Sequence, residues 1–148
     1  MSQSPGLESL DDLRNRIRNV GLRATAPRIA VLRSLLHVAT PQSHADVVER
    51  LAHEGWDRAT IYRNLTDLTE AGLVRRTDLG DHVWRFELRA LRGGLAEADH
   101  PHFMCDGCGD IQCLPDETVE LKPARGAPRA LHRQRVQIQI RGRCDRCA

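Results

Sequence analysis

Two pairs of cysteines, each spaced C-x-x-C, constrain the second half of this sequence more than any other feature. Cys105 and Cys108 form the first pair, and Cys144 and Cys147 form the second. Each C-x-x-C turn presents two thiolates to one point, so the two turns together supply the four sulfurs of a closed, tetrahedral structural zinc site. Four free thiols or a redox pair is the alternative interpretation of the same pattern. Because a domain this small needs a staple, we expect structural Zn²⁺.

Composition and charge limit the cellular compartment and the kind of nucleic-acid surface that this sequence can have. Its 148 residues carry a formal net charge of +2, so any nucleic-acid surface must be a local patch. The sequence has no apolar run of membrane-spanning length and no signal peptide, which predicts a cytoplasmic protein with reduced thiols. Five cysteines are an odd number, which leaves Cys113 for another role.

Hydrophobic spacing in the first 88 residues predicts four helices followed by a β-hairpin. The third helix is short, the turn after it is tight, and the fourth helix is longer, which is the helix-turn-helix pattern. A hairpin after the fourth helix makes a wing. The expected helices run over 10–20, 25–37, 43–55 and 57–72, and the expected strands over 73–77 and 82–88.

The rest of the chain has a different organisation. Residues 89–99 lack a strong pattern and are interpreted as a hinge. Short strands are expected at 103–104 and 111–114, around the first C-x-x-C, and at 136–141 before the second, with an interrupted helix from Asp116. The predicted fold class is α+β, with a winged helix-turn-helix domain over 1–88 and a small metal-binding domain over 100–148.

Polar and basic residues of the first domain are candidates for DNA contacts. Outward side chains of a recognition helix contact base edges in the major groove, and arginines near a helix start or a wing hold phosphates. The alternative is that these are ordinary solvated side chains on a protein-contact module. The candidates are Arg23, Arg28, Arg58, Thr60, Tyr62, Arg63, Asn64, Arg75 and Arg76.

Further metal ligands flank the first cysteine pair. His100 and His102 alternate, so they share one face of an extended segment, and Cys113 follows the pair. These ligands exceed the needs of one structural zinc, which suggests a second, exchangeable metal. A small buried hydrophobic residue is the alternative role for Cys113.

Several motifs together resemble the ferric uptake regulator family, over nearly the whole chain from residue 10 to 147. The resemblance implies a dimeric, metal-sensing transcriptional repressor with an amino-terminal winged helix and a carboxy-terminal α/β dimerisation domain. The motifs are Gly21-Leu22-Arg23-x-Thr25-x-x-Arg28, Ala59-Thr60-Ile61-Tyr62-Arg63-Asn64-Leu65, Phe86-Glu87-Leu88, His100-x-His102-x-x-Cys105-x-x-Cys108-Gly109 and Gly142-x-Cys144-x-x-Cys147.

The resemblance also implies a regulatory metal site. Its ligands carry over to Glu87, His100, His102 and Cys113, where Cys113 replaces the carboxylate usual in the family. A thiolate favours zinc over ferrous iron or manganese. Metal binding is then expected to join the two domains and to set the spacing of two recognition helices in a homodimer on a palindromic operator.

Other family ligand positions differ in this sequence. Pro41 occupies the position of a linker histidine, with His44 in a different register, and Pro101 and Val136 replace the ligands of a further family site, which we expect to be absent. Asp78 and His82, in the expected hairpin, are possible extra ligands, although a surface role is favoured.

Alternative functions remain open at this stage. Within the family, the chain is also consistent with an iron, manganese or peroxide sensor. From other classes, a zinc-ribbon protein-interaction module and a thiol redox protein are consistent with the cysteines. The sequence contains no nucleophile–base constellation and no phosphate-binding glycine loop, so we do not predict an enzyme.

Overall fold

The computed structural model describes residues 9–36, 38, 40–89, 100–115, 118–132 and 136–148. The described residues fall into two compact units. The amino-terminal unit draws on residues 1–78 and 83–89, and the carboxy-terminal unit on 79–82 and 90–148. Residues 90–99 of the predicted hinge lie outside the described part of the chain. No helix among the described residues is long and apolar enough to cross a membrane.

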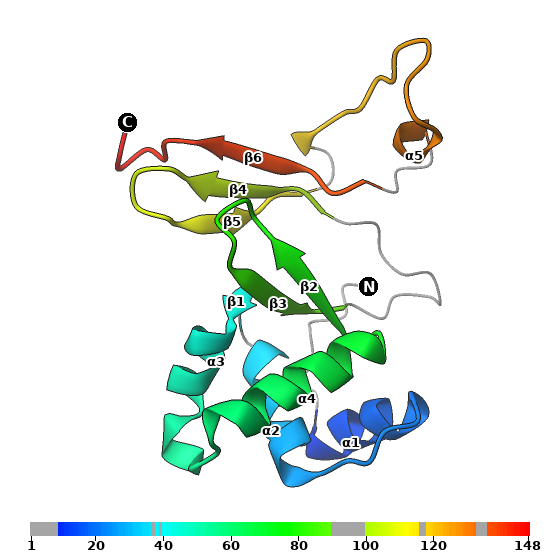
Figure 1. Ribbon diagram of the computed structural model, residues 1–148, viewed down its shortest axis with the longest axis vertical. Helices are drawn as coiled ribbons and strands as arrows, with labels where there is room; N and C mark the ends of the chain where they lie inside the picture. The colour runs from blue at the N-terminus through cyan, green and yellow to red at the C-terminus, as the bar shows by residue number, and fades with distance from the viewer. Residues whose placement is uncertain (1–8, 37, 39, 90–99, 116–117, 133–135) are drawn as a thin grey trace, which may run out of the picture. The chain divides into compact units, whose positions relative to one another are not determined.

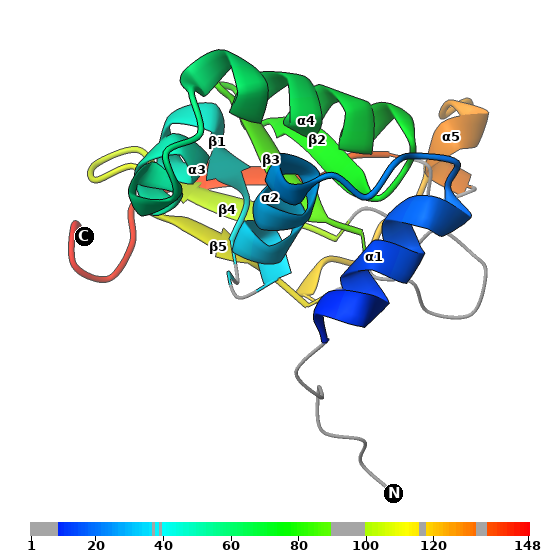
Figure 2. The same cartoon turned by 90° about the horizontal axis from the view of Figure 1, so that it is seen from below.

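The amino-terminal unit begins with four α-helices, and a short 3-10 helix precedes the last of them (Figure 1). Helix α2 contacts both α1 and α4, and α3 contacts α4 (Figure 2). The helices are α1 (Leu10–Asn19), α2 (Ala26–Leu36), α3 (His44–Arg50), η1 (Ala52–Glu54) and α4 (Arg58–Glu70).

Side-chain caps explain where the third and fourth helices begin. Ser43 accepts the backbone N–H of Asp46 at 3.1 Å, and the Asp46 carboxylate accepts the Ser43 N–H at 2.8 Å. This reciprocal capping box fixes the start of α3. Asp57 accepts the Thr60 N–H at 2.6 Å, and hydrogen bonding by Thr60 holds the pKa of Asp57 below its usual range. Gly55, in the left-handed region at φ 77°, provides the tight turn between the two helices.

A three-stranded antiparallel sheet completes this unit. Its strands are β1 (Gln42–Ser43), β2 (Val74–Asp78) and β3 (Trp84–Leu88), in the order β1-β3-β2. The sequence predicted the β2–β3 pair, which is called the wing below. It did not predict β1, because Gln42 belonged to an expected connector and forms a strand only by pairing with Phe86. Helices α3 and α4 with the wing form a winged helix-turn-helix.

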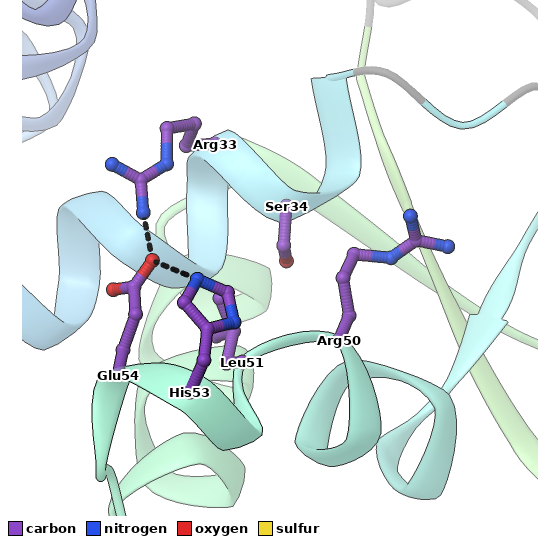
Figure 3. A pocket seen from close by; sticks show the side chains of 6 residues that line it. All are labelled: Arg33, Ser34, Arg50, Leu51, His53 and Glu54. Atoms are coloured by element: carbon purple, nitrogen blue, oxygen red, sulfur yellow. Dashed lines mark hydrogen bonds and ion pairs between the residues drawn. The ribbon is translucent and has the colours of Figure 1, made fainter.

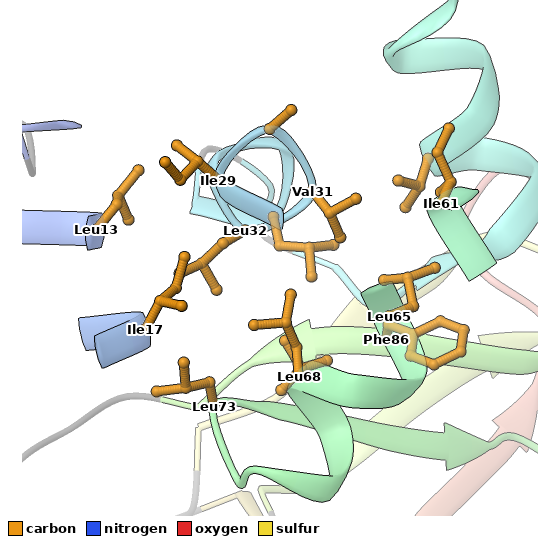
Figure 4. Packing of buried hydrophobic residues seen from close by; sticks show 14 of the residues in the cluster. Leu13, Ile17, Ile29, Val31, Leu32, Ile61, Leu65, Leu68, Leu73 and Phe86 are labelled. Atoms are coloured by element: carbon orange, nitrogen blue, oxygen red, sulfur yellow. The ribbon is translucent and has the colours of Figure 1, made fainter. Parts of the chain in front are cut away.

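The hydrophobic core of the amino-terminal unit lies where helices α1, α2 and α4 meet the sheet (Figure 4). Leu65 of α4 and Phe86 of β3 are fully buried there, beside Leu32 of α2. The core therefore orients α4 through its apolar stripe and leaves the opposite stripe of this helix to solvent. The labelled core residues are Leu13, Ile17, Ile29, Val31, Leu32, Ile61, Leu65, Leu68, Leu73 and Phe86.

The carboxy-terminal unit contains a second three-stranded sheet, in the order β5-β4-β6 (Figure 1). Strand β4 pairs antiparallel with β5 and parallel with β6. The elements are β4 (His102–Cys105), β5 (Ile111–Cys113), α5 (Arg129–His132) and β6 (Gln139–Gly142). The one-turn helix α5 was not predicted, whereas residues 119–121 of an expected helix are not helical and 116–117 lie outside the described residues.

Candidate functional site

Parallel pairing of β4 with β6 brings the two C-x-x-C turns together. Cys105 is the last residue of β4 and lies opposite Gly142, the last residue of β6. The carboxyl ends of parallel strands lie at the same end of a sheet. Cys105 and Cys144 therefore lie close together although they are 39 residues apart in the sequence. The backbone N–H of Cys144 confirms this by donating to the Cys105 sulfur at 3.3 Å.

The four sulfurs have the spacing that tetrahedral zinc requires. All four Sγ atoms of Cys105, Cys108, Cys144 and Cys147 lie within 4.8 Å of one another. The Sγ atoms of Cys108 and Cys144 are 3.7 Å apart. A Zn–S bond of about 2.3 Å in tetrahedral geometry separates neighbouring sulfurs by about 3.8 Å, so the donor set fits a structural zinc ion.

Backbone groups prepare one of these sulfurs as a thiolate. Cys105 is buried, and backbone N–H groups of Cys108 and Cys144 lower the pKa of its thiol to about 6. In contrast, hydrogen bonding with the neighbouring thiols, that of Cys108 first, raises the pKa of Cys147 to about 12. Four thiolates do not share one pocket without a compensating cation, and bound zinc supplies that charge.

Gly107 leaves the space into which the second turn packs. A Cβ atom on Gly107 would lie 3.0 Å from the Cys147 Cβ and 3.1 Å from its Sγ. The backbone N–H of Gly107 also donates to the Cys105 sulfur at 3.3 Å. A side chain at this position therefore requires Cys147, the fourth zinc ligand, to shift by a few tenths of an ångström.

A second group of potential ligands lies in the same unit. The register places Cys113 of β5 opposite His102 of β4, so their side chains share one face of the sheet. The rings of His100 and His102 are 4.5 Å apart, and His102 is buried. One ligand atom from each of these three residues lies within 4.8 Å of the others. Two imidazoles and one thiolate suit a borderline cation such as zinc.

Glu87, the fourth predicted regulatory ligand, lies in the amino-terminal unit and is engaged there. Arg75 donates to its Oε1 from Nη2 at 2.6 Å and from Nε at 3.0 Å. Both side chains are largely buried, with exposed fractions of 17% for Arg75 and 12% for Glu87. The membership of Glu87 in a metal site stays a prediction from the sequence.

The predicted DNA-contacting residues on helix α4 differ in their exposure to solvent. Arg58, Tyr62 and Arg63 are exposed, and Thr60 is half-buried. Asn64 is only 6% exposed and donates from Nδ2 to the Thr60 carbonyl at 2.9 Å. Its side chain faces inward, so we leave Asn64 out of the DNA-contacting set proposed below.

The two predicted arginines near the start of α2 also differ. Arg23 is exposed. Arg28 is largely buried, pairs with Asp67 of α4 at 2.6 Å and donates to the Arg23 carbonyl at 2.9 Å. The Arg28 guanidinium thus ties α2 to α4. No local pattern indicated this role, because the partner lies 39 residues away in the sequence.

Adjacent arginines of the wing lie on opposite faces, as strand alternation requires. Arg75 pairs with Glu87, as described above, whereas the Arg76 guanidinium lies over the Trp84 ring, with Cζ 4.3 Å from the ring centroid. Trp84 was missing from the sequence-based candidates. The signal that points to it is the cross-strand register, since Trp84 on β3 lies diagonally opposite Arg76 on β2.

The remaining candidate ligands are placed as follows. His44 Nε2 is 2.9 Å from the Arg58 carbonyl oxygen, and the centroids of the His44 and Tyr62 rings are 5.4 Å apart in an edge-to-face arrangement. Asp78 ends β2, and His82 is exposed with φ 61°. Neither Asp78, His82 nor His44 belongs to a group of three or more potential ligands among the described residues.

One open pocket of the amino-terminal unit has none of these candidates among its lining residues (Figure 3). It has a volume of about 480 Å³ and lies beside α2, α3 and η1. Arg33 pairs with Glu54 across it, so the charge of this arginine is already balanced. None of its lining residues was a predicted site residue, and its chemistry suggests no ligand.

Replacing Gly107 tests the zinc site. We expect Gly107→Ala to release zinc to a chromogenic chelator at least about tenfold faster than wild type, because the added methyl group displaces Cys147. Gly142→Ala is the matched control, since its Cβ would meet Phe103 at an ordinary 3.5 Å. Equal rates of zinc release from the two variants would contradict the close approach of Gly107 to Cys147.

Replacing Arg75 tests the ion pair of the wing. We expect Arg75→Gln to lower the free energy of unfolding of the amino-terminal unit by about 1–3 kcal/mol, because Glu87 loses a charged partner. Arg76→Gln, at an exposed position, should cost less than about 1 kcal/mol. Tryptophan fluorescence during urea unfolding measures this unit, because Trp56 and Trp84 both belong to it. A larger loss of unfolding free energy for Arg76→Gln than for Arg75→Gln would contradict a stabilising role for the Arg75–Glu87 ion pair.

Comparisons with known proteins agree with this architecture. Residues 19–140 match the Ferric uptake regulator family. The ferric uptake regulation protein of Legionella pneumophila is 32% identical over 136 residues, which cover 89% of this chain and 96% of that protein. Ferric uptake regulation protein 1 of Mycolicibacterium fortuitum is 34% identical over 106 residues, which cover 69% of this chain and 62% of that protein.

Among solved structures, a zinc uptake regulator complexed with zinc and DNA has the same fold, with a TM-score of 0.60 at 21% identity. The match covers 98% of this chain and 96% of that chain. Members of the family are transcription regulators rather than enzymes. The chain therefore belongs to the ferric uptake regulator family of metal-dependent transcriptional regulators.

Proposed function

We propose that this protein is a zinc-responsive transcriptional repressor that binds operator DNA as a homodimer. In this proposal, one zinc ion stays on the four cysteines, and a second, exchangeable zinc ion binds at His100, His102 and Cys113. The second ion is the co-repressor, so DNA affinity rises with zinc supply. The protein works in the cytoplasm, where the ligand thiols stay reduced.

The observation that carries the choice of zinc is the position of Cys113. The register of β4 and β5 sets this thiol directly opposite His102, on the face that the ring of His100 also shares. A thiolate among imidazoles favours zinc, whereas ferrous iron and manganese prefer harder oxygen ligands.

Glu87 is the fourth ligand that we propose for this exchangeable zinc, on the basis of the family resemblance. Its carboxylate is held by Arg75 within the amino-terminal unit. Both hydrogen bonds from Arg75 end on Oε1, and a carboxylate has two oxygens, so zinc would bind this group beside the guanidinium. A metal bound there would add a cation next to the Arg75–Glu87 pair of the wing, which provides a physical link between the ion and the DNA-binding unit.

Helix α4 is the recognition helix in this proposal. Arg58, Tyr62 and Arg63 are exposed polar side chains near its amino-terminal end, and Asp57 caps that end. Two recognition helices of a homodimer contact two half-sites, so the operator is expected to be palindromic. Arg23 and Arg76, both exposed, are the proposed phosphate contacts.

Metal titration of DNA binding tests the proposed co-repressor. With the four-cysteine zinc retained, added Zn²⁺ should raise operator affinity more than Fe²⁺ or Mn²⁺ at equal free concentration. Cys113→Asp restores an oxygen ligand and should shift the preference toward Fe²⁺ and Mn²⁺. His53→Ala removes an exposed histidine outside the site and is the control. Equal DNA affinity with and without added zinc would rule out zinc as the co-repressor.

Arginine substitutions separate DNA contacts from structural contacts. Arg63→Ala should weaken operator binding by about 1–3 kcal/mol, with the unfolding midpoint unchanged, because its side chain is displayed on α4. Arg28→Ala should instead lower the unfolding midpoint, because Asp67 loses its partner. DNA titrations and urea unfolding measure the two effects. Unchanged DNA binding by Arg63→Ala would contradict the recognition helix.

A further inference from the structure

Two exposed positions of the wing hold an arginine paired with an aromatic ring. The Arg76 guanidinium carbon lies 4.3 Å from the centroid of the Trp84 ring. This is well inside the distance of about 6 Å at which a cation is attracted to the face of an aromatic ring, and tryptophan gives the strongest attraction. The pair spans both strands of the wing, since Arg76 belongs to β2 and Trp84 to β3.

The Arg76 guanidinium keeps its hydrogen-bonding capacity for another molecule. Within the part of the chain that the structure describes, no carboxylate forms an ion pair with Arg76, in contrast to Arg75 and its partner Glu87. A cation–π contact engages the face of the ring and consumes none of the five N–H donors of a guanidinium. Trp84 thus restrains the arginine without neutralising it.

Trp84 itself is unusually placed for so large an apolar side chain. It is 48% exposed, and the neighbouring Val83 is 40% exposed. The wing is coupled closely to α4, because the Leu73 N–H donates to the Leu68 carbonyl at 3.0 Å just before β2 begins. A guanidinium held on this strand therefore has a fixed position relative to the exposed residues of α4.

We propose that Trp84 is a positioning residue that holds the Arg76 guanidinium ready for a phosphate of the operator DNA. The inference rests on the proposed DNA-binding function and deepens it. A free arginine side chain loses rotational freedom when it binds a phosphate, and a side chain already restrained against a ring loses less. The contact is to the sugar–phosphate backbone, so it adds affinity without adding sequence preference.

A double-mutant cycle on the zinc-loaded, full-length protein tests this role. Affinity for operator DNA and for unrelated duplex is measured across a salt series for wild type, Trp84→Ala, Arg76→Ala and the double variant. Trp84→Ala should weaken both DNAs about two- to fivefold. Arg76→Ala should weaken both more and reduce the salt slope by about one. The double variant should bind as Arg76→Ala does, because Trp84 acts only through Arg76.

Further variants separate positioning from a merely structural role. Trp84→Phe keeps a ring under the cation and should recover most of the affinity lost in Trp84→Ala. Val83→Ala removes a neighbouring exposed apolar side chain and should leave DNA affinity unchanged. Urea unfolding of each variant shows whether the wing remains folded.

Two outcomes would overturn the inference alone. One is a loss of DNA affinity in the double variant equal to the product of the losses in the two single variants, which would mean that Trp84 contacts DNA independently of Arg76. The other is an unfolding midpoint lowered by Trp84→Ala with DNA affinity unchanged. In both cases Arg63→Ala still weakens operator binding, so the proposed function stands. Absence of zinc-dependent DNA binding by the wild type would overturn the proposed function and the inference together.

Discussion

The parallel pairing of β4 with β6 is the constraint on which the carboxy-terminal unit depends. It aligns the ends of two strands that are far apart in sequence, and each strand runs directly into a C-x-x-C turn. The register sets Cys105 against Gly142, and the backbone N–H of Cys144, in the second turn, donates to the Cys105 sulfur. Zinc and the sheet therefore stabilise each other, because the ion needs the aligned strands and a sheet this small needs a cross-link.

In the amino-terminal unit, burial sorts the arginines into two groups with different consequences. Arg28 and Arg75 neutralise Asp67 and Glu87 inside the unit, where loss of one partner leaves an uncompensated charge. Arg58, Arg63 and Arg76 remain at the surface, where they are available for the DNA contacts proposed above. The wing shows both groups in adjacent residues of one strand, because Arg75 pairs with Glu87 whereas Arg76 is exposed.

Much of this architecture could be predicted from the sequence, because it depends on local signals. Caps at Ser43 and Asp57, apolar spacing along α4 and the cysteine spacing all act within a few residues. The remaining features depend on partners distant in sequence. Strand β1 exists because Gln42 meets Phe86, and the inward position of Asn64 depends on how the core orients α4. Likewise, no local signal showed that Arg76 would meet Trp84.

The separation of the two cysteine pairs has a consequence for the order of folding. Cys105 and Cys108 lie in the turn of a local hairpin, whereas Cys144 is 36 residues beyond Cys108. Local turns close within microseconds, and the entropic cost of closing a loop grows with its length. A nascent or refolding chain therefore offers a half-site of two thiolates before the other two arrive. An ion bound at that half-site gains its other two sulfur ligands only when β6 pairs with β4, so completion of the centre is tied to formation of the sheet.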